Sequence, residues 1–140
     1  MLADDATAIG GKLYVHGGGW DIVHATAVPT TVARMALVLT IKVEYDEALK
    51  DQSLTIDLVD EDDQPAAGVR IEGVLRVGHP PDSRPGEPTY VSQALRFEAI
   101  KLDRIGRYHF RVFVGGEDAP FASIPFRLSM LHSPPGSPVA

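Results

Sequence analysis

Hydrophobic and polar residues alternate with a period of two along much of this chain. In residues 35–45 the large apolar side chains occupy every second position, namely Met35, Leu37, Leu39, Ile41, Val43 and Tyr45. Because successive side chains of a strand point to opposite faces, this spacing predicts a half-buried β-strand and not a helix. The pattern recurs in residues 53–60, 69–77, 107–114 and 122–130, and more weakly in 2–9, 12–17 and 93–102.

Turn-forming residues separate these segments. Gly10-Gly11, the acidic run 60–65 followed by Gly68, and residues 115–120 each lie between two alternating segments, and they predict hairpins. Residues 46–51 could form at most one helical turn. About eight short strands with no helix between them predict an all-β fold, an antiparallel Greek-key β-sandwich. We expect one domain over residues 1–132 and a proline-rich, flexible tail over 133–140.

Three local features refine this prediction. Gly106 places Tyr108 at the start of a strand, which resembles the tyrosine corner of Greek-key sandwiches. Gly73 falls in mid-strand and predicts a bulge or a close backbone approach, whereas Pro125 predicts an edge strand or a bulge. Trp20 should be mostly buried, and the inward positions should form the core: Leu37, Leu39, Ile41, Leu54, Ile56, Leu58, Ile71, Tyr108, Phe110, Val112, Phe126 and Leu128.

Some apolar residues fall on the polar faces of these strands. Single exposed apolar residues are common on proteins, but several on outer faces predict a contact patch. They are Val38, Val59, Val74, Ile100 and Phe113.

Composition narrows the range of activities. With 44% hydrophobic and 23% charged residues, the 140-residue chain has the make-up of an ordinary globular domain. It has no cysteine, which excludes disulfides, thiolate metal sites and cysteine nucleophiles. The net charge of −6 argues against nucleic-acid binding. No signal peptide is visible, and the longest apolar run, residues 35–41, is too short to cross a membrane. We therefore expect a cytoplasmic protein with neither nucleic-acid nor membrane partners.

The segment from His16 through three glycines to Trp20 resembles the oxyanion-hole strand of esterases. That enzyme also needs a serine in a Gly-x-Ser-x-Gly elbow and crossover helices, and the chain has neither. We expect instead a glycine-rich strand end that Trp20 anchors in the core. The sequence thus favours a protein without catalytic activity and indicates no cofactor.

Two sets of polar residues could hold a metal ion. The acidic run Asp60–Asp63 lacks the glycine and the final glutamate of an EF-hand, so a solvated turn is expected, with a cation at one end of the sandwich as the alternative. His16, His24 and Asp21 have no metal-binding spacing in sequence, but folding could bring them together as a zinc or iron site.

Four blocks occur in one order along the chain: residues 3–6, 11–21, 58–62 and 106–112. Together they resemble a family of small bacterial, largely actinobacterial, proteins catalogued as a domain of unknown function. The resemblance covers nearly the whole chain except the tail. It implies a β-sandwich and no established activity, so it assigns no catalytic residues.

Two classes of function remain. The first is a non-catalytic binding or assembly module that acts through a sheet face on a protein partner or on itself as a homo-oligomer, with Val74 and Phe113 as interface residues. The second is a small-ligand or metal-binding protein, or an enzyme, with its site at the Gly17–Asp21 strand end and the 78–88 loop as a rim. There Trp20, Asp21, His16 and His24 would be the sensitive positions.

Overall fold

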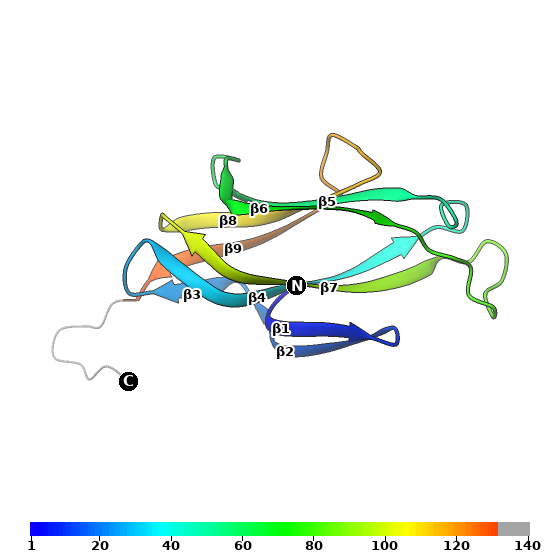
Figure 1. The fold of residues 1–140 in the computed structure, drawn as a ribbon, viewed down its shortest axis with the longest axis horizontal. Helices are drawn as coiled ribbons and strands as arrows, with labels where there is room; N and C mark the ends of the chain where they lie inside the picture. The colour runs from blue at the N-terminus through cyan, green and yellow to red at the C-terminus, as the bar shows by residue number, and fades with distance from the viewer. Residues whose placement is uncertain (132–140) are drawn as a thin grey trace.

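The computed structural model describes residues 1–131 and folds them into two β-sheets without a helix (Figure 1). The predicted tail at 133–140, together with His132, lies outside the described residues. The strands are β1 (Leu2–Ile9), β2 (Lys12–Trp20), β3 (Ile22–Ala25), β4 (Thr30–Val43), β5 (Gln52–Asp60), β6 (Pro65–Leu75), β7 (Thr89–Leu102), β8 (Gly106–Val114) and β9 (Ala122–Met130).

The all-β prediction is confirmed. One sheet has the order β2-β1-β4-β7 and the other the order β3-β9-β8-β5-β6. Every neighbouring pair is antiparallel except β3 with β9, which is parallel. The chain passes between the sheets at five connections, β2–β3, β3–β4, β4–β5, β6–β7 and β7–β8, and the two sheets pack face to face as a sandwich. Sequence reasoning did not find β3.

The main core lies between the inner faces of the two sheets. Phe97 of the four-stranded sheet stacks on Phe110 of the five-stranded sheet at a centroid distance of 5.3 Å. Most of the expected core is buried, but Ile71 is 36% exposed because β6 is an edge strand. The buried residues of this core are Leu2, Ala25, Met35, Leu37, Ile56, Leu58, Phe97, Ile100, Leu102, Tyr108, Phe110, Val112, Phe126 and Leu128.

The hairpin of β1 and β2 folds over the outer face of β4 and β7, and it lies below both strands in Figure 1. β1 pairs with β4 only at Leu2 and Ala3 and then leaves that strand. A second apolar cluster forms beneath the hairpin, and it includes Ala36 and Val38. The prediction that Val38 is an exposed patch residue is therefore wrong, because the chain covers this position with its own N-terminal hairpin.

Asp5 of β1 holds this hairpin in place electrostatically. Its carboxylate accepts hydrogen bonds from Arg96 of β7 at 2.9 Å and from Arg34 of β4 at 3.5 Å. Burial by itself raises the pKa of Asp5. The hydrogen bond from the Ala6 N–H and the two guanidinium groups outweigh this effect, so the pKa lies below its usual value. The hairpin is thus fixed by an ionised carboxylate as well as by apolar contacts.

A backbone irregularity explains why Ile100 is also buried. Ala99 has a φ of 53°, in the left-handed region that residues with a side chain rarely adopt. Phe97 points into the core, and regular alternation would make Ala99 the next inward residue. The structure places Ile100 there instead. The two-residue period therefore shifts by one position, which places Ile100 in the core and not on the outer face.

The five-stranded sheet contains a second irregularity, at a place other than the one predicted. The pairing of β5 with β6 shifts between Asp57 and Val59, and Ala67 and Gly68 both have positive φ. Gly73 pairs regularly with β5, so the bulge predicted there is absent. Val59, which was expected to be exposed on the outer face, is fully buried. Its register partners on the neighbouring strands are Pro65 and His109, which flank it on both sides.

A single turn follows β4, where the sequence allowed at most one helical turn at residues 46–51. The N–H groups of Glu47 and Ala48 both donate to the carbonyl of Glu44, and Leu49 adopts a positive φ that ends the turn. The N–H of Leu49 then donates to the carbonyl of Val77 at 2.7 Å. Within residues 1–131 no helix is long and apolar enough to cross a membrane.

The tyrosine corner is confirmed. The hydroxyl of Tyr108 donates to the carbonyl oxygen of Arg104 at 2.6 Å and accepts from the Arg104 N–H at 3.3 Å. Burial raises the pKa of Tyr108, which keeps this hydroxyl protonated and able to donate. The corner fixes the connection between β7 and β8, and hence one crossing between the two sheets.

We expect the substitution Tyr108→Phe to lower the free energy of unfolding by about 1–2 kcal/mol, because it leaves a partly buried carbonyl without its donor. Urea denaturation followed by circular dichroism measures the change. Tyr14→Phe is the matched control, since Tyr14 is about half exposed. Equal effects of the two substitutions would contradict a structural role for the corner.

Candidate functional site

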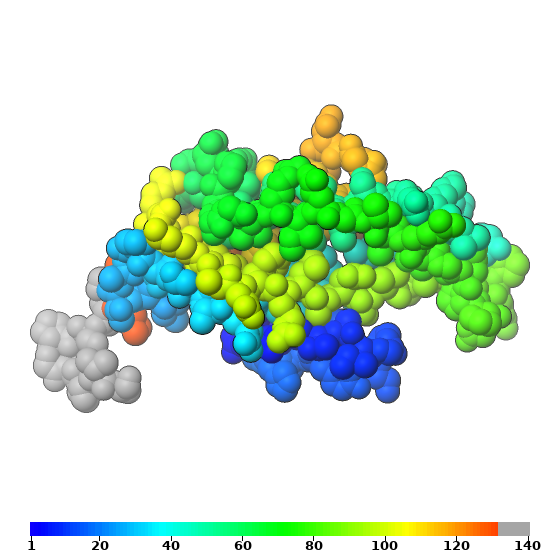
Figure 2. All heavy atoms as spheres, viewed as in Figure 1, coloured from blue at the N-terminus to red at the C-terminus, as the bar shows by residue number. Residues whose placement is uncertain are grey.

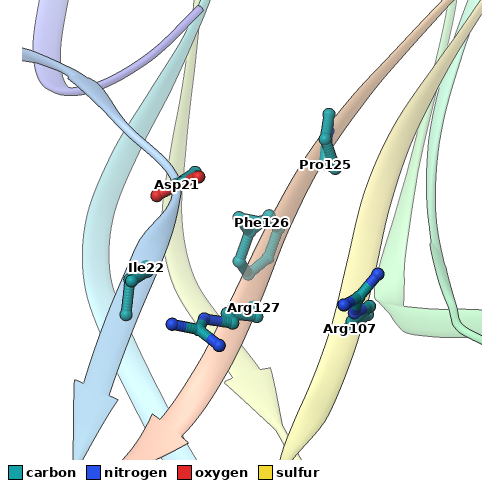
Figure 3. Close-up of a pocket in the computed structure, with 6 residues that line it drawn as sticks. All are labelled: Asp21, Ile22, Arg107, Pro125, Phe126 and Arg127. Carbon is teal, nitrogen blue, oxygen red and sulfur yellow. The ribbon is translucent and has the colours of Figure 1, made fainter.

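A cleft of about 320 Å³ lies where β2 gives way to β3. Asp21, the residue between these strands, forms one wall (Figure 3). β9 crosses the middle of the close-up, and β8 borders it on the far side from Asp21. The lining residues are Asp21, Ile22, Arg107, Pro125, Phe126 and Arg127.

The cleft exists because β3 covers only part of β9. β3 pairs with residues 127–130, and the N–H of Arg127 donates to the Asp21 carbonyl at 2.9 Å. Upstream of Arg127, β9 pairs with β8 alone and has a free edge. Pro125 lies in this stretch, and no strand on the free side requires a hydrogen bond from the N–H group that proline lacks. The expectation of an edge strand thus applies to one half of β9, although β9 is an inner strand of the sheet.

Two arginines face each other across β8 and β9. Arg107 is the register partner of Arg127. Because the Arg127 N–H donates to Asp21 and not toward β8, these residues form a non-hydrogen-bonded pair, in which opposed side chains lie closest. Like charges placed directly opposite in a sheet are unfavourable. The fold therefore concentrates positive charge beside the cleft of a protein whose net charge is −6.

The other arginines of this sheet face differ in having carboxylate partners. Arg111 binds Asp57 through two hydrogen bonds of 2.9 and 2.7 Å. Arg70 bonds to Glu72 at 2.9 Å. Within residues 1–131, neither Arg107 nor Arg127 has a carboxylate within 4.0 Å. The two guanidinium groups thus lack a direct ion-pair partner, although the Asp21 carboxylate lines the same cleft.

The residues predicted at the Gly17–Asp21 strand end do not converge. Trp20 is half-buried, and its ring packs edge-on against Phe126 with 6.5 Å between the ring centroids. The indole Nε1 is buried and has no hydrogen-bond acceptor among residues 1–131. Asp21 lines the cleft, whereas His16 and His24 are exposed on β2 and β3. In the described part of the chain no three His, Asp or Glu side chains group as metal ligands. The proposed His16/His24/Asp21 zinc or iron set is therefore not formed.

The acidic run forms a hairpin turn. The carboxylate of Asp60 accepts from the N–H groups of Gln64 at 3.0 Å and Asp62 at 2.9 Å, and from Arg104 at 2.6 Å. The Gln64 bond is the main reason why the pKa of Asp60 is lowered, since it outweighs desolvation and is reinforced by Asp62 and Arg104. Because this carboxylate already has three donors, the solvated turn expected from the sequence describes it better than a cation site.

The predicted interface residues do not form one patch. Val38, Val59 and Ile100 are buried, so only Val74 and Phe113 remain on the surface. Val74 is 69% exposed at the edge strand β6. Phe113 lies on β8, with β5 between it and β6, and the guanidinium carbon of Arg111 is 5.2 Å from its ring centroid. Val74 therefore belongs to an edge and Phe113 to the middle of the sheet.

Arg107 and Arg127 were missed by sequence reasoning. Both occupy polar positions of strands predicted correctly, at 107–114 and 122–130. The loop 115–121 between these strands is too long to fix the register from its sequence. Without the register, nothing indicates that the two arginines occupy opposite positions on neighbouring strands.

Comparison with protein-family models identifies residues 1–129 as the family of unknown function DUF6941. The chain therefore belongs to this family, in agreement with the resemblance noted from its sequence blocks. Searches of the curated proteins and of the solved structures returned no match.

Proposed function

We propose that this member of family DUF6941 is a non-catalytic assembly module that pairs with a second copy of itself through the free edge of β6. The observation that carries the proposal is the sequence Arg70-Ile71-Glu72, which is its own complement in antiparallel pairing. The cytoplasmic location and the bacterial origin expected from the sequence are part of the same proposal.

β6 is the exposed edge of the five-stranded sheet. It pairs with β5 on one side only, and nearly all its residues are exposed or half-buried. Figure 2 shows the green atoms of β6 uncovered toward the viewer. An edge strand presents a row of unpaired N–H and C=O groups, which is a template for pairing with another strand.

The register follows from the charges. When two copies of β6 pair antiparallel about Ile71, Arg70 of each copy lies opposite Glu72 of the other, on the outer face of the sheet. Ile71 then lies opposite its own counterpart on the core side, where it is 36% exposed in the single chain. Val74 lies opposite Gly68, which leaves room for its exposed side chain. A two-fold axis at Ile71 thus gives each member of the Arg70–Glu72 ion pair a second, oppositely charged neighbour from the other copy, and it covers both Ile71 side chains.

Charge reversal tests this arrangement. We expect the wild-type protein to be a dimer at about 100 μM, and Arg70→Glu or Glu72→Arg to weaken it by about 30-fold, since each change replaces two attractive contacts by two repulsive ones. The double variant Arg70→Glu/Glu72→Arg restores opposite charges and should restore the dimer. Analytical ultracentrifugation over a range of concentrations measures all four proteins.

The controls separate assembly from folding. Arg76→Glu changes an equally exposed arginine just beyond β6, and we expect it to leave the dimer unchanged. Circular dichroism should show the same β-sheet spectrum for every variant. A monomeric wild-type protein, or a double variant that dimerises no better than the single ones, would overturn the proposal.

A further inference from the structure

We propose that the cleft between β3 and β9 binds a small anionic molecule, through the guanidinium groups of Arg107 and Arg127, and that Asp21 recognises a hydrogen-bond donor on the same molecule. The ligand class is a carboxylate or phosphate that also bears an amine. This site is separate from the β6 edge, since β9 and β6 lie on opposite sides of β8 and β5.

The charge of the cleft is the first argument. Arg107 and Arg127 are direct register partners on neighbouring strands, and two like charges at such positions are unfavourable unless an anion lies near them. The nearest acids on β5 are already engaged, because Asp60 binds Arg104 and Asp57 binds Arg111. Arg107 also borders a smaller cleft with Glu61, but the ion pair in that cleft joins Arg104 to Asp60 and does not involve Arg107. A bound anion would supply the missing partner for both guanidinium groups.

The shape of the cleft indicates a small molecule. A volume of about 320 Å³ is at the lower end for small-ligand sites. Pro125, Phe126 and Ile22 provide apolar lining, and the two arginines provide planar donors suited to carboxylate or phosphate oxygens. In Figure 3 the Arg127 side chain extends across the cleft toward Ile22, while Arg107 remains on the β8 side.

Asp21 adds a requirement for a donor. Its carboxylate lines the same cleft and is exposed, so it would repel a ligand that carries only negative charge. An amine on the ligand would turn this repulsion into attraction. The cleft should therefore prefer a molecule with both charges over a simple anion.

Titrations of the ¹⁵N-labelled protein at constant ionic strength, followed by amide NMR, test the site. The probes are acetate, glycine, inorganic phosphate and phosphoethanolamine. We expect saturable shifts of the Ile22, Phe126 and Arg127 amides. Glycine should bind more tightly than acetate, and phosphoethanolamine more tightly than inorganic phosphate. The comparison of glycine with phosphoethanolamine decides between carboxylate and phosphate.

Variants identify the groups responsible. We expect Arg107→Gln and Arg127→Gln each to weaken binding at least tenfold. The control Arg76→Gln changes an exposed arginine that does not line the cleft, and it should leave binding unchanged. Asp21→Asn should abolish the preference for the amine-bearing probes and leave phosphate or acetate binding intact. In the absence of any probe, Arg127→Gln should not lower Tm, because it removes one of two neighbouring like charges that have no carboxylate within ion-pair distance.

Several results would overturn the proposal. One is the absence of saturable shifts at the cleft with all four probes. Another is binding that persists unchanged in Arg107→Gln and Arg127→Gln, or that falls equally in Arg76→Gln. A lower Tm for ligand-free Arg127→Gln would assign that arginine a structural role instead. None of these outcomes depends on whether the protein dimerises.

Discussion

Replacing Phe110 by alanine is expected to lower the free energy of unfolding by about 3–5 kcal/mol, the largest effect of any substitution considered for this protein. Phe110 is fully buried, and its ring stacks on Phe97 at 5.3 Å and lies 5.9 Å from Phe126. Phe97 belongs to the other sheet, so the substitution opens a cavity at the contact between the two layers. Urea denaturation followed by circular dichroism measures the loss.

An exposed phenylalanine is the matched control. Phe121 is 62% exposed in the loop before β9, and we expect Phe121→Ala to change the unfolding free energy by less than about 0.5 kcal/mol. If Phe110→Ala cost as little as Phe121→Ala, the aromatic stack would not hold the two sheets together.

Removing the carboxylate of Asp57 is expected to lower the free energy of unfolding by about 2–3 kcal/mol. Breaking a fully buried ion pair would cost more, but Arg111 is partly exposed. Asp57 is only 8% exposed, yet it lies on the outer face of the five-stranded sheet and binds Arg111 bidentately. The hydrogen bonding that Arg111 donates to Asp57 is also the main reason why the pKa of Arg111 is raised. Asp57→Ala leaves that guanidinium without its partner.

A double-mutant cycle separates this pair from its surroundings. Arg111→Met alone should be at least as costly as Asp57→Ala, since it leaves the more buried carboxylate unpaired. The combination Asp57→Ala/Arg111→Met should cost less than the sum of the two single losses, because it removes both charges together and leaves neither unpaired. A double variant whose loss equals the sum of the single losses would show that the two side chains do not interact.

The local features were predictable because each depends on neighbours in sequence. Alternation alone predicted every strand except β3, since it reports which face of each strand is buried. The Tyr108 corner was predictable because its hydrogen bonds join residues only four positions apart. The turn at residues 60–65 followed from its acidic and proline residues, and its Asp60 carboxylate makes the bonds that such a turn needs.

The surface was predicted less well, for identifiable reasons. Alternation says which residues share a face but not what covers that face, so Val38 was assigned to a patch although the β1–β2 hairpin covers it. A single positive φ at Ala99 reverses the alternation, and nothing in the identity of an alanine signals it. Ile100 was misplaced for this reason.

The candidate sites divide in the same way. Asp21 could be singled out from its place at a glycine-rich strand end, and it does line the cleft. His16 and His24 could not be excluded as its partners, since their separation in space depends on the course of β2 and β3. Arg107 and Arg127 were not visible as a pair, because their opposition is a property of the β8–β9 register.

The sequence by itself determined the elements: an all-β chain, the segments that form most of its strands, the hairpin turns and the tyrosine corner. These depend on side-chain period and on backbone preferences that act over a few residues. Only the tertiary structure decided which strands are edges, which outer faces are covered and which charges are left without partners. Those properties arise from contacts between residues far apart in the chain, and both the β6 edge and the Asp21–Arg107–Arg127 cleft are properties of that kind.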